Sequence, residues 1–291
     1  MQPSKTMVVY PMVSALLKAE DMLGPDRVWK PINETQALFL TEFFQMCREE
    51  AMSLSEIESI ASRNIEDINT FLRQRGFTIQ LRPLGPDSFG VASVLDLLVT
   101  WQEPGAKVRV ECIVDHRTYD AVWLGDGIRY SLNSPHPHPI VTIKTQSGDV
   151  VHMSKLDHAP EGFELVHLAE QLTPLPNQTR TASSVTFPMV DLNQEVDVSW
   201  MGGMQTRDEG DRPFLIAQAL QQTILKMNEQ GARAKSASAM GIILGSAAIH
   251  SYPIIVIDAP FLLWFTRPNL KKPLFVGYIT MADWKNPGSL S

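Results

Sequence analysis

Two kinds of apolar periodicity follow one another along this 291-residue chain, and their order is the strongest constraint on its fold. Helical spacing dominates from residue 12 to residue 77, with interruptions at Pro25 and Pro31. From residue 91 onward the apolar residues alternate or form short continuous runs, as strands do. Strands are expected at 91–101, 108–112, 141–144, 185–190, 196–198, 223–227, 254–257, 261–265 and 274–279. Helices that precede strands, without regular alternation of the two, indicate an α+β fold with a mainly antiparallel sheet.

The helical part carries signals for helix ends. Ser53 and Glu56 have the spacing of a capping box, which predicts a helix that begins there. Gly76 stands where a C-terminal helix cap is expected.

The most linker-like stretch, 173–184, is short, and the chain has no internal repeat. We therefore expect a single domain over residues 1–291.

Composition excludes several classes of function. The chain carries 25 Lys and Arg against 32 Asp and Glu, so its formal net charge is −7. A nucleic-acid partner is not expected, because such proteins need a positive surface to neutralise phosphates. No run of 18 apolar residues occurs, so no membrane span is predicted. Cys47 and Cys112 are too few for a disulfide framework or a Cys-rich zinc site, and the sequence leaves open whether they pair.

The N-terminus has some features of an export signal. Lys5 precedes an apolar stretch, 6–17, as in the first two regions of a signal peptide. The stretch runs into charged residues at 18–21 without a small-x-small cleavage site, so we interpret it as the first buried helix. Glycosylation sequons at Asn33 and Asn177 leave export and glycosylation open.

Motifs for catalysis, cofactors and metals are largely missing from the sequence. His136 and His138 are the main metal candidates, since a His-x-His pair on a strand points both rings to one face. Prolines throughout 135–139 favour a solvated, extended loop instead, and no third ligand is specified. Asp115 and His116 are adjacent but have no identifiable nucleophile. We therefore predict no enzyme activity, no cofactor and no bound metal.

The most informative segment is 226–246, where a strand-like run leads to Glu229-Gln230-Gly231 and then to small residues. The chain end adds Asp-Ala-Pro-Phe-Leu-Leu-Trp-Phe at 258–265, Pro-Leu-Phe-Val-Gly-Tyr-Ile at 273–279 and Asn-Pro at 286–287. In order and spacing, these pieces resemble the reactive-centre hinge and the C-terminus of serpins.

Weaker matches to the same family extend toward the N-terminus. Residues 8–24 are similar to serpin helix B, and residues 68–71 look like the start of helix F. Residues 91–104 resemble the third strand of the main sheet, with Trp101 at the position of the tryptophan in the breach. The resemblance implies a serpin-like fold with a reactive-centre loop over about 229–252.

The resemblance also implies a mechanism and a partner. A serine protease, or alternatively a cysteine protease, cleaves the exposed loop, which then inserts into the main sheet as an additional strand. The family's loop length places the scissile carbonyl at Gly245, before Ser246, or at Leu244 if the alignment contains a gap. None of the three is basic, which favours a chymotrypsin- or elastase-like target over a trypsin-like one. The resemblance implies a monomer and an extracellular location. Because the N-terminus has no convincing signal peptide, an intracellular location is the alternative.

The residues after Gly231 permit a physical test of insertion, because a segment that becomes a central strand must alternate between two faces. With Ala232 as the first inserting residue, the inward face carries Ala232, Ala234, Ser236 and Ser238, and the outward face carries Arg233, Lys235, Ala237 and Ala239. A shift by one residue would bury both charged side chains. A flexible loop rich in Ala and Ser is the alternative interpretation, which explains the small residues but not their phase.

Several departures from the family pattern count against insertion. The chain is shorter than a typical serpin and has no counterpart of helix A, which suggests a compact member from a viral or otherwise streamlined genome. Val13, Gln221 and Ser93 stand where the family has the characteristic groups of its shutter. Gln221 can still form a hydrogen bond there, whereas the side chain of Val13 cannot. Two hypotheses follow: a protease inhibitor that inserts its loop, or a non-inhibitory serpin-fold protein with a binding or immunomodulatory role.

Overall fold

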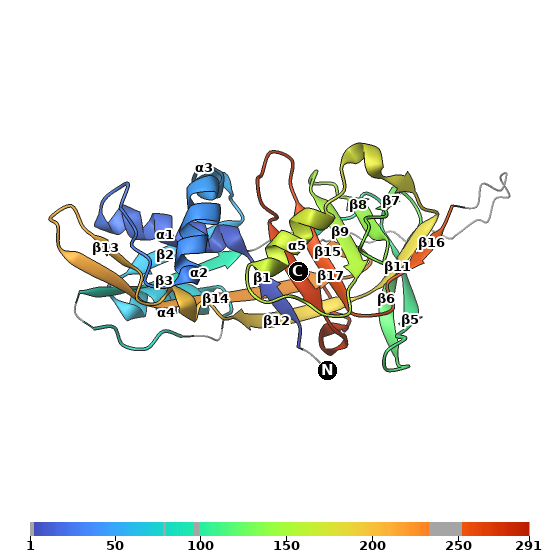
Figure 1. The fold of residues 1–291 in the computed structure, drawn as a ribbon. Coiled ribbons are helices and arrows are strands. Elements are labelled where there is room, and N and C mark those ends of the chain that lie inside the picture. The colour runs from blue at the N-terminus through green and yellow to red at the C-terminus, as the bar shows by residue number, and fades with distance from the viewer. Residues whose placement is uncertain (1–2, 78–79, 86, 96–98, 233–251, 291) are drawn as a thin grey trace.

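The computed structural model describes residues 3–77, 80–85, 87–95, 99–232 and 252–290. The molecule is elongated, with α1–α3 at one end and the strands β5, β6 and β16 at the other (Figure 1). The helices are α1 (Val9–Leu23), α2 (Glu34–Leu38), α3 (Gln45–Ser53), α4 (Ile65–Gln74) and α5 (Glu164–Leu172), with a π-helical segment, η1 (Phe39–Phe44), and the 3-10 helices η2 (Pro176–Gln178), η3 (Ser199–Met201) and η4 (Met281–Asp283). The expected α+β class is confirmed.

The strands form three main sheets, named here by strand number. The five-stranded sheet contains β2 (Ile57–Ser62), β3 (Ser88–Leu95), β14 (Pro213–Met227), β12 (Val190–Val196) and β13 (Gln205–Arg207). The seven-stranded sheet contains β1 (Lys5–Met7), β18 (Phe275–Ile279), β17 (Phe261–Thr266), β9 (Val150–Lys155), β8 (Ile140–Lys144), β7 (Ile128–Ser131) and β10 (Arg180–Thr181). The four-stranded sheet contains β16 (Ile254–Val256), β11 (Ser184–Pro188), β6 (Thr118–Leu124) and β5 (Ala106–Glu111).

Most strand pairs are antiparallel, as expected, but two pairs that position the candidate site are parallel. Strand β14 runs parallel to β3, with Gln221 opposite Ser93, and β11 runs parallel to β16. A short antiparallel pair, β4 (Val99–Thr100) with β15 (Gly231–Ala232), lies beyond the end of β3. The long strand β14 therefore has β12 along one edge and β3 along part of the other.

Helices cover both faces of the five-stranded sheet. Phe89 and Val91 of β3 belong to the main core together with the buried side of α1. The alternate residues Ala92 and Val94 form a separate small core with Ile68 and Leu72 of α4, against which Leu220 packs. Successive strand residues point to opposite faces, so α1 covers one face of β3 and α4 covers the other.

One helix prediction is wrong. Ser53 ends α3, where its hydroxyl donates to the carbonyl oxygen of Glu50 at 2.7 Å, and Glu56 precedes a strand instead of lying in a helix. Ile57 and Ile60, just after Glu56, belong to β2, in which Ile57 lies opposite Leu95 of β3. Pairing with β3 supplies the backbone partners of this segment, and such long-range partners outweigh a local spacing pattern.

The predicted C-terminal helix cap at Gly76 is confirmed. Gly76 follows α4 with φ of 77°, a conformation that glycine adopts without strain, and its N–H donates to the carbonyl of Arg73. Cys47 and Cys112 are buried and free, so they do not form the disulfide that the sequence left open. Within the described part of the chain, no helix is long and apolar enough to cross a membrane.

Candidate functional site

The candidate site begins where β14 ends, in a tight turn over residues 228–231 that we call the hinge turn. The N–H of Asn228 donates to the carbonyl of Gly231 at 2.8 Å, and the N–H of Gly231 donates back at 3.2 Å. The Asn228 side-chain oxygen accepts from the N–H of Gln230 at 2.9 Å. Gly231 has φ of 142°, which residues with a side chain rarely adopt. The hinge turn thus reverses the direction of the chain, as a two-residue hairpin does, and it requires glycine at its last position.

The reversed chain returns beside the sheet. In strand β15, Gly231 lies opposite Thr100 and Ala232 lies opposite Val99, in an antiparallel pair with β4. Because Gly231 also bridges Asn228, the start of β15 lies between the end of β4 and the end of β14. The structure therefore brings together the hinge residues Glu229, Gly231 and Ala232 that the sequence singled out.

The buried side chain of Trp101 holds the hinge turn through a hydrogen bond. Its side chain is 1% exposed, and its Nε1–H donates to the carbonyl of Asn228 at 2.9 Å. Its ring packs edge-on against Phe187, with ring centroids 5.7 Å apart. Trp101 also bridges Thr145 in the turn between β8 and β9. The tryptophan thereby joins the hinge turn to the body of the protein.

Glu229 connects the hinge turn to the neighbouring strand β5. Its carboxylate lies 3.3 Å from the Lys107 ammonium, and its carbonyl accepts from the N–H of Gly105 at 2.7 Å. The Asn228 side-chain amide donates to the carbonyl of Gly288 at 3.0 Å. Sequence reasoning missed Asn228 and Lys107. The Asn-to-Gly spacing of 228–231 is typical of a turn and could have indicated the first, but nothing local indicates a partner more than a hundred residues away.

Of the residues at the shutter-like positions, Gln221 and Ser93 lie on the central strands of the five-stranded sheet, and Val13 lies in α1. Gln221 donates from Nε2 to the carbonyl of Val8 at 3.2 Å, as its chemistry allows, while its Oε1 has no hydrogen-bond partner among the described residues. Val13 of α1 is fully buried in the main core. Next to it in α1, Ser14 accepts a hydrogen bond from Ser59 of β2 at 2.9 Å. Ser14, the residue after Val13, therefore links α1 to the five-stranded sheet.

Several predicted site residues lie outside the described part of the chain. These are the hinge residues Ala234, Ser236, Ala237 and Ser238 and the reactive-bond candidates Leu244, Gly245 and Ser246. Their assignments remain predictions.

The histidine-containing candidates for other chemistry are engaged in local contacts. His136 Nε2 lies 2.7 Å from the Ser154 hydroxyl, and its ring is edge-on to His138 at 5.9 Å. Burial and the neighbouring His138 lower the pKa of His136. Asp115 accepts from the Tyr119 hydroxyl at 2.6 Å, and this bond lowers the pKa of Asp115. Over the described ranges, no three His, Cys, Asp or Glu side chains are grouped so that they could hold a metal ion.

Comparison by sequence gives limited information. No model of a known protein family matches this chain. The hibernation-specific plasma protein HP-55 of Tamias sibiricus is 38% identical over 69 residues, which make up 24% of this chain and 16% of that protein. The match thus spans about one sixth of the curated relative's length.

Comparison by structure extends over nearly the whole chain. Serpin48 of the insect Tenebrio molitor matches with a TM-score of 0.58 and 12% identity, over 97% of this chain and 92% of that one. The mouse protein-Z dependent protease inhibitor gives 0.53 and 13%, over 96% and 91%. Human thyroxine-binding globulin gives 0.56 and 10%, over 96% and 98%. At such identities the likeness concerns the fold alone.

Proposed function

We propose, from the premise that this chain has the serpin fold, that it inhibits a serine protease, or alternatively a cysteine protease, through cleavage and insertion of its loop 231–246. The observation that carries the proposal is the pairing of Gly231 and Ala232 with β4. This pair lies beyond the ends of β3 and β14, at the point where a loop that separates these two strands would enter. An inhibitor that inserts its loop needs this entry point.

The register of the neighbouring strands supports insertion without a slip. Continued along β3, the pairing of β15 with β4 would bring Ser238 opposite Ser93. Continued along β14, the hairpin register of the hinge turn would bring Ser238 opposite Gln221. Ser93 and Gln221 are already opposite each other in the parallel pair. A segment inserted between the two strands would therefore pair with both in one register.

The same register agrees with the inward phase predicted from the sequence. Residues directly opposite each other in a sheet share a face. Ser93 and Gln221 are buried on the α1 side, so Ser238 and the alternate residues Ser236, Ala234 and Ala232 would face the protein body. Small side chains fit there, whereas a buried, unpaired charge would be costly.

The outward residues also agree with the position of α4. In this register Ala239 and Ala237 would lie beside Ala92 and Val94, which α4 covers. Lys235 would lie beside Ile224, whose side chain is exposed. The two long cationic residues, Arg233 and Lys235, would thus lie beyond the helix, and alanine would occupy the covered positions.

An experiment with chymotrypsin- and elastase-like proteases, and trypsin as the comparison, tests the proposal. Cleavage near Leu244, Gly245 or Ser246 should give an SDS-stable covalent complex, and the cleaved protein should gain thermal stability. Ala234→Arg should abolish both effects without preventing cleavage, because it places a charge on the inward face. Lys235→Arg is the matched control, since it keeps a cation on the outward face. Cleavage with neither a complex nor a gain in stability would contradict loop insertion.

A non-inhibitory binding protein is the second candidate function. The buried Val13 favours it, because this position offers no polar group to control opening of the sheet. The fold likeness to thyroxine-binding globulin is compatible with such a role. In the same assay this candidate predicts loop cleavage as in an ordinary substrate, with the unfolding temperature unchanged.

A further inference from the structure

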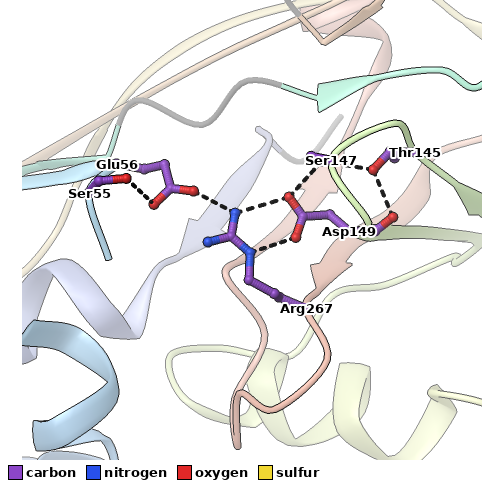
Figure 2. Close-up of polar contacts among 6 residues, drawn as sticks. All are labelled: Ser55, Glu56, Thr145, Ser147, Asp149 and Arg267. Atoms are coloured by element: carbon purple, nitrogen blue, oxygen red, sulfur yellow. Dashed lines mark hydrogen bonds and ion pairs between the residues drawn. The ribbon is translucent and has the colours of Figure 1, made fainter. Parts of the chain in front are cut away.

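A network of three charged side chains connects the five-stranded sheet to the seven-stranded sheet. Arg267 follows β17, Asp149 lies between β8 and β9, and Glu56 precedes β2. Arg267 Nε lies 2.6 Å from Asp149 Oδ1, and Nη2 lies 3.1 Å from Oδ2 of the same carboxylate. The same Nη2 lies 2.5 Å from Glu56 Oε1. Figure 2 shows the guanidinium between the two carboxylates, and we call these three residues the Arg267 clamp.

The Asp149 end of the clamp is rigidly held. The Asp149 side chain is fully buried, and its Oδ2 accepts from the Ser147 hydroxyl at 3.0 Å. The backbone carbonyl of Asp149 accepts from the Thr145 hydroxyl at 2.8 Å (Figure 2). The hydrogen bond that Arg267 makes with Asp149 raises the pKa of Arg267 most, and the hydrogen bond with Glu56 also raises it. A buried carboxylate with a two-point contact to arginine is a strong and well-oriented anchor.

The Glu56 end is more exposed and reaches the other sheet. The Glu56 side chain is 23% exposed, and the Ser55 hydroxyl donates to its second oxygen at 3.3 Å. Burial by itself would raise the pKa of Glu56, but the hydrogen bond and charge of Arg267, together with the other hydrogen bonds to Glu56, outweigh burial and lower the pKa. The residue after Glu56 is Ile57, the first residue of β2, which lies opposite Leu95 of β3. The Arg267 clamp thus contacts the strand pair β2–β3 at the end where Ile57 lies opposite Leu95.

The anchoring turn between β8 and β9 also holds the continuation of β3. The N–H of Gln146 donates to the carbonyl of Thr100 in β4 at 2.9 Å, and Thr145 bridges Trp101. One turn of the seven-stranded sheet therefore holds β4 directly and β2 through Arg267. The contacts with β4 and with Glu56 both hold the strands on the side of β15 where β3 lies, and not those on the side of β14.

We propose that the Arg267 clamp is a positioning device that holds the strands β2, β3 and β4 against the seven-stranded sheet and limits how fast the five-stranded sheet opens between β3 and β14. Opening must break the pairing of Ser93 with Gln221, and it requires the β2–β3 pair to move away from β14. The effect of the Arg267 clamp on loop insertion rests on the proposed function, whereas its effect on the opening of the sheet does not.

Glu56→Gln tests the clamp selectively. It removes the charge that reaches β2 but leaves the buried Asp149 paired with Arg267, so the anchor itself remains satisfied. Glu170→Gln is the matched control. Glu170 is 28% exposed and pairs with Lys272 at 2.8 Å, in the same loop as Arg267, but it lies on α5 and not on the five-stranded sheet.

Hydrogen exchange of the intact full-length chain reads sheet opening directly. In Glu56→Gln, amides of β2 and β3 should exchange about tenfold faster, while those of β17 and β18 should keep their wild-type rates. Glu56→Asp, which keeps the charge but shortens its reach, should give an intermediate rate. Unchanged exchange in β2 and β3, a uniform increase along the chain, or the same effect in Glu170→Gln would overturn the clamp.

A second measurement separates the clamp from the proposed function. After cleavage of the loop by an elastase-like protease, the gain in thermal stability should develop about tenfold faster in Glu56→Gln than in wild type. If cleaved wild-type protein gains no stability, the insertion proposal fails, and hydrogen exchange alone decides whether the clamp holds the strands. If insertion occurs at equal rates in both proteins, the clamp proposal fails and the inhibitory one stands.

Discussion

Replacing His152 by glutamine should remove much of the pH dependence of this protein's stability in mildly acidic solution. His152 lies in β9 with 3% of its surface exposed, and its ring stacks on Trp264 at 5.1 Å. Its two ring nitrogens lie 3.2 Å from the Thr142 hydroxyl and 3.0 Å from the Thr266 hydroxyl. Burial lowers the pKa of His152 to about 3, so the folded protein holds a neutral ring.

The size of the effect follows from proton linkage. Below the ordinary histidine pKa of about 6.5 the unfolded chain binds a proton at His152, whereas the folded chain does not until the pH approaches 3. Stability is therefore fully present above the unfolded pKa and decreases as the pH falls, by up to about 1.4 kcal/mol per pH unit. From about pH 7 to about pH 5 this one residue should lower the free energy of unfolding by about 2 kcal/mol.

Urea unfolding of wild type and His152→Gln at both pH values provides the assay. The His152→Gln protein should be less stable than wild type at neutral pH, because the stacking of residue 152 on Trp264 is lost. That loss does not depend on pH. All other titrating groups are common to the two proteins, so the difference between their pH responses isolates His152. His136→Gln is the control, because His136 is less buried and should show a smaller effect. Parallel pH profiles for wild type and His152→Gln would refute the reasoning.

Two further predictions concern the hinge and the thiols. Trp101→Phe should lower the free energy of unfolding by about 1 kcal/mol, because the Asn228 carbonyl loses the indole donor but keeps the N–H of Gly231. Trp101→Ala should cost about 3 to 5 kcal/mol by leaving a cavity, and equal effects in urea unfolding would contradict this account. Burial raises the pKa of both thiols, that of Cys47 to about 11, so a thiol reagent should modify Cys47 and Cys112 only after unfolding. Rapid labelling of the folded protein would show that the thiols are accessible.

Strands with their own alternation were predictable, and strands that depend on partners were not. Strand β5 spans Ala106–Glu111 close to the expected 108–112, and β17 spans Phe261–Thr266 against an expected 261–265. By contrast, β14 begins at Pro213, although only 223–227 read as a strand. The polar and half-exposed residues in its first part are held by pairing with β3 and β13. Such pairing is invisible to a pattern that considers one segment at a time.

The candidate site divides in the same way. Gly231 and the small residues after it could be recognised from their types and spacing, and Gln221 could be expected to form a hydrogen bond. The acceptor, the carbonyl of Val8, is 213 residues away in the chain, and the partner of Glu229 is Lys107. No local feature of the sequence predicts either contact.

By itself, the sequence determined that most helices precede most strands, the alternation of small residues after Gly231 and the serpin-like pattern of the chain end, because each depends on residue types at short, regular spacings. Only the tertiary structure decided that β15 enters beside β4, and that Arg267 joins Glu56 to Asp149. Glu56 and Arg267 are 211 residues apart, and their contact exists because two sheets pack so that the start of β2 meets the loop after β17. Burial then gives these charges a strength and direction that isolated residues in water do not have.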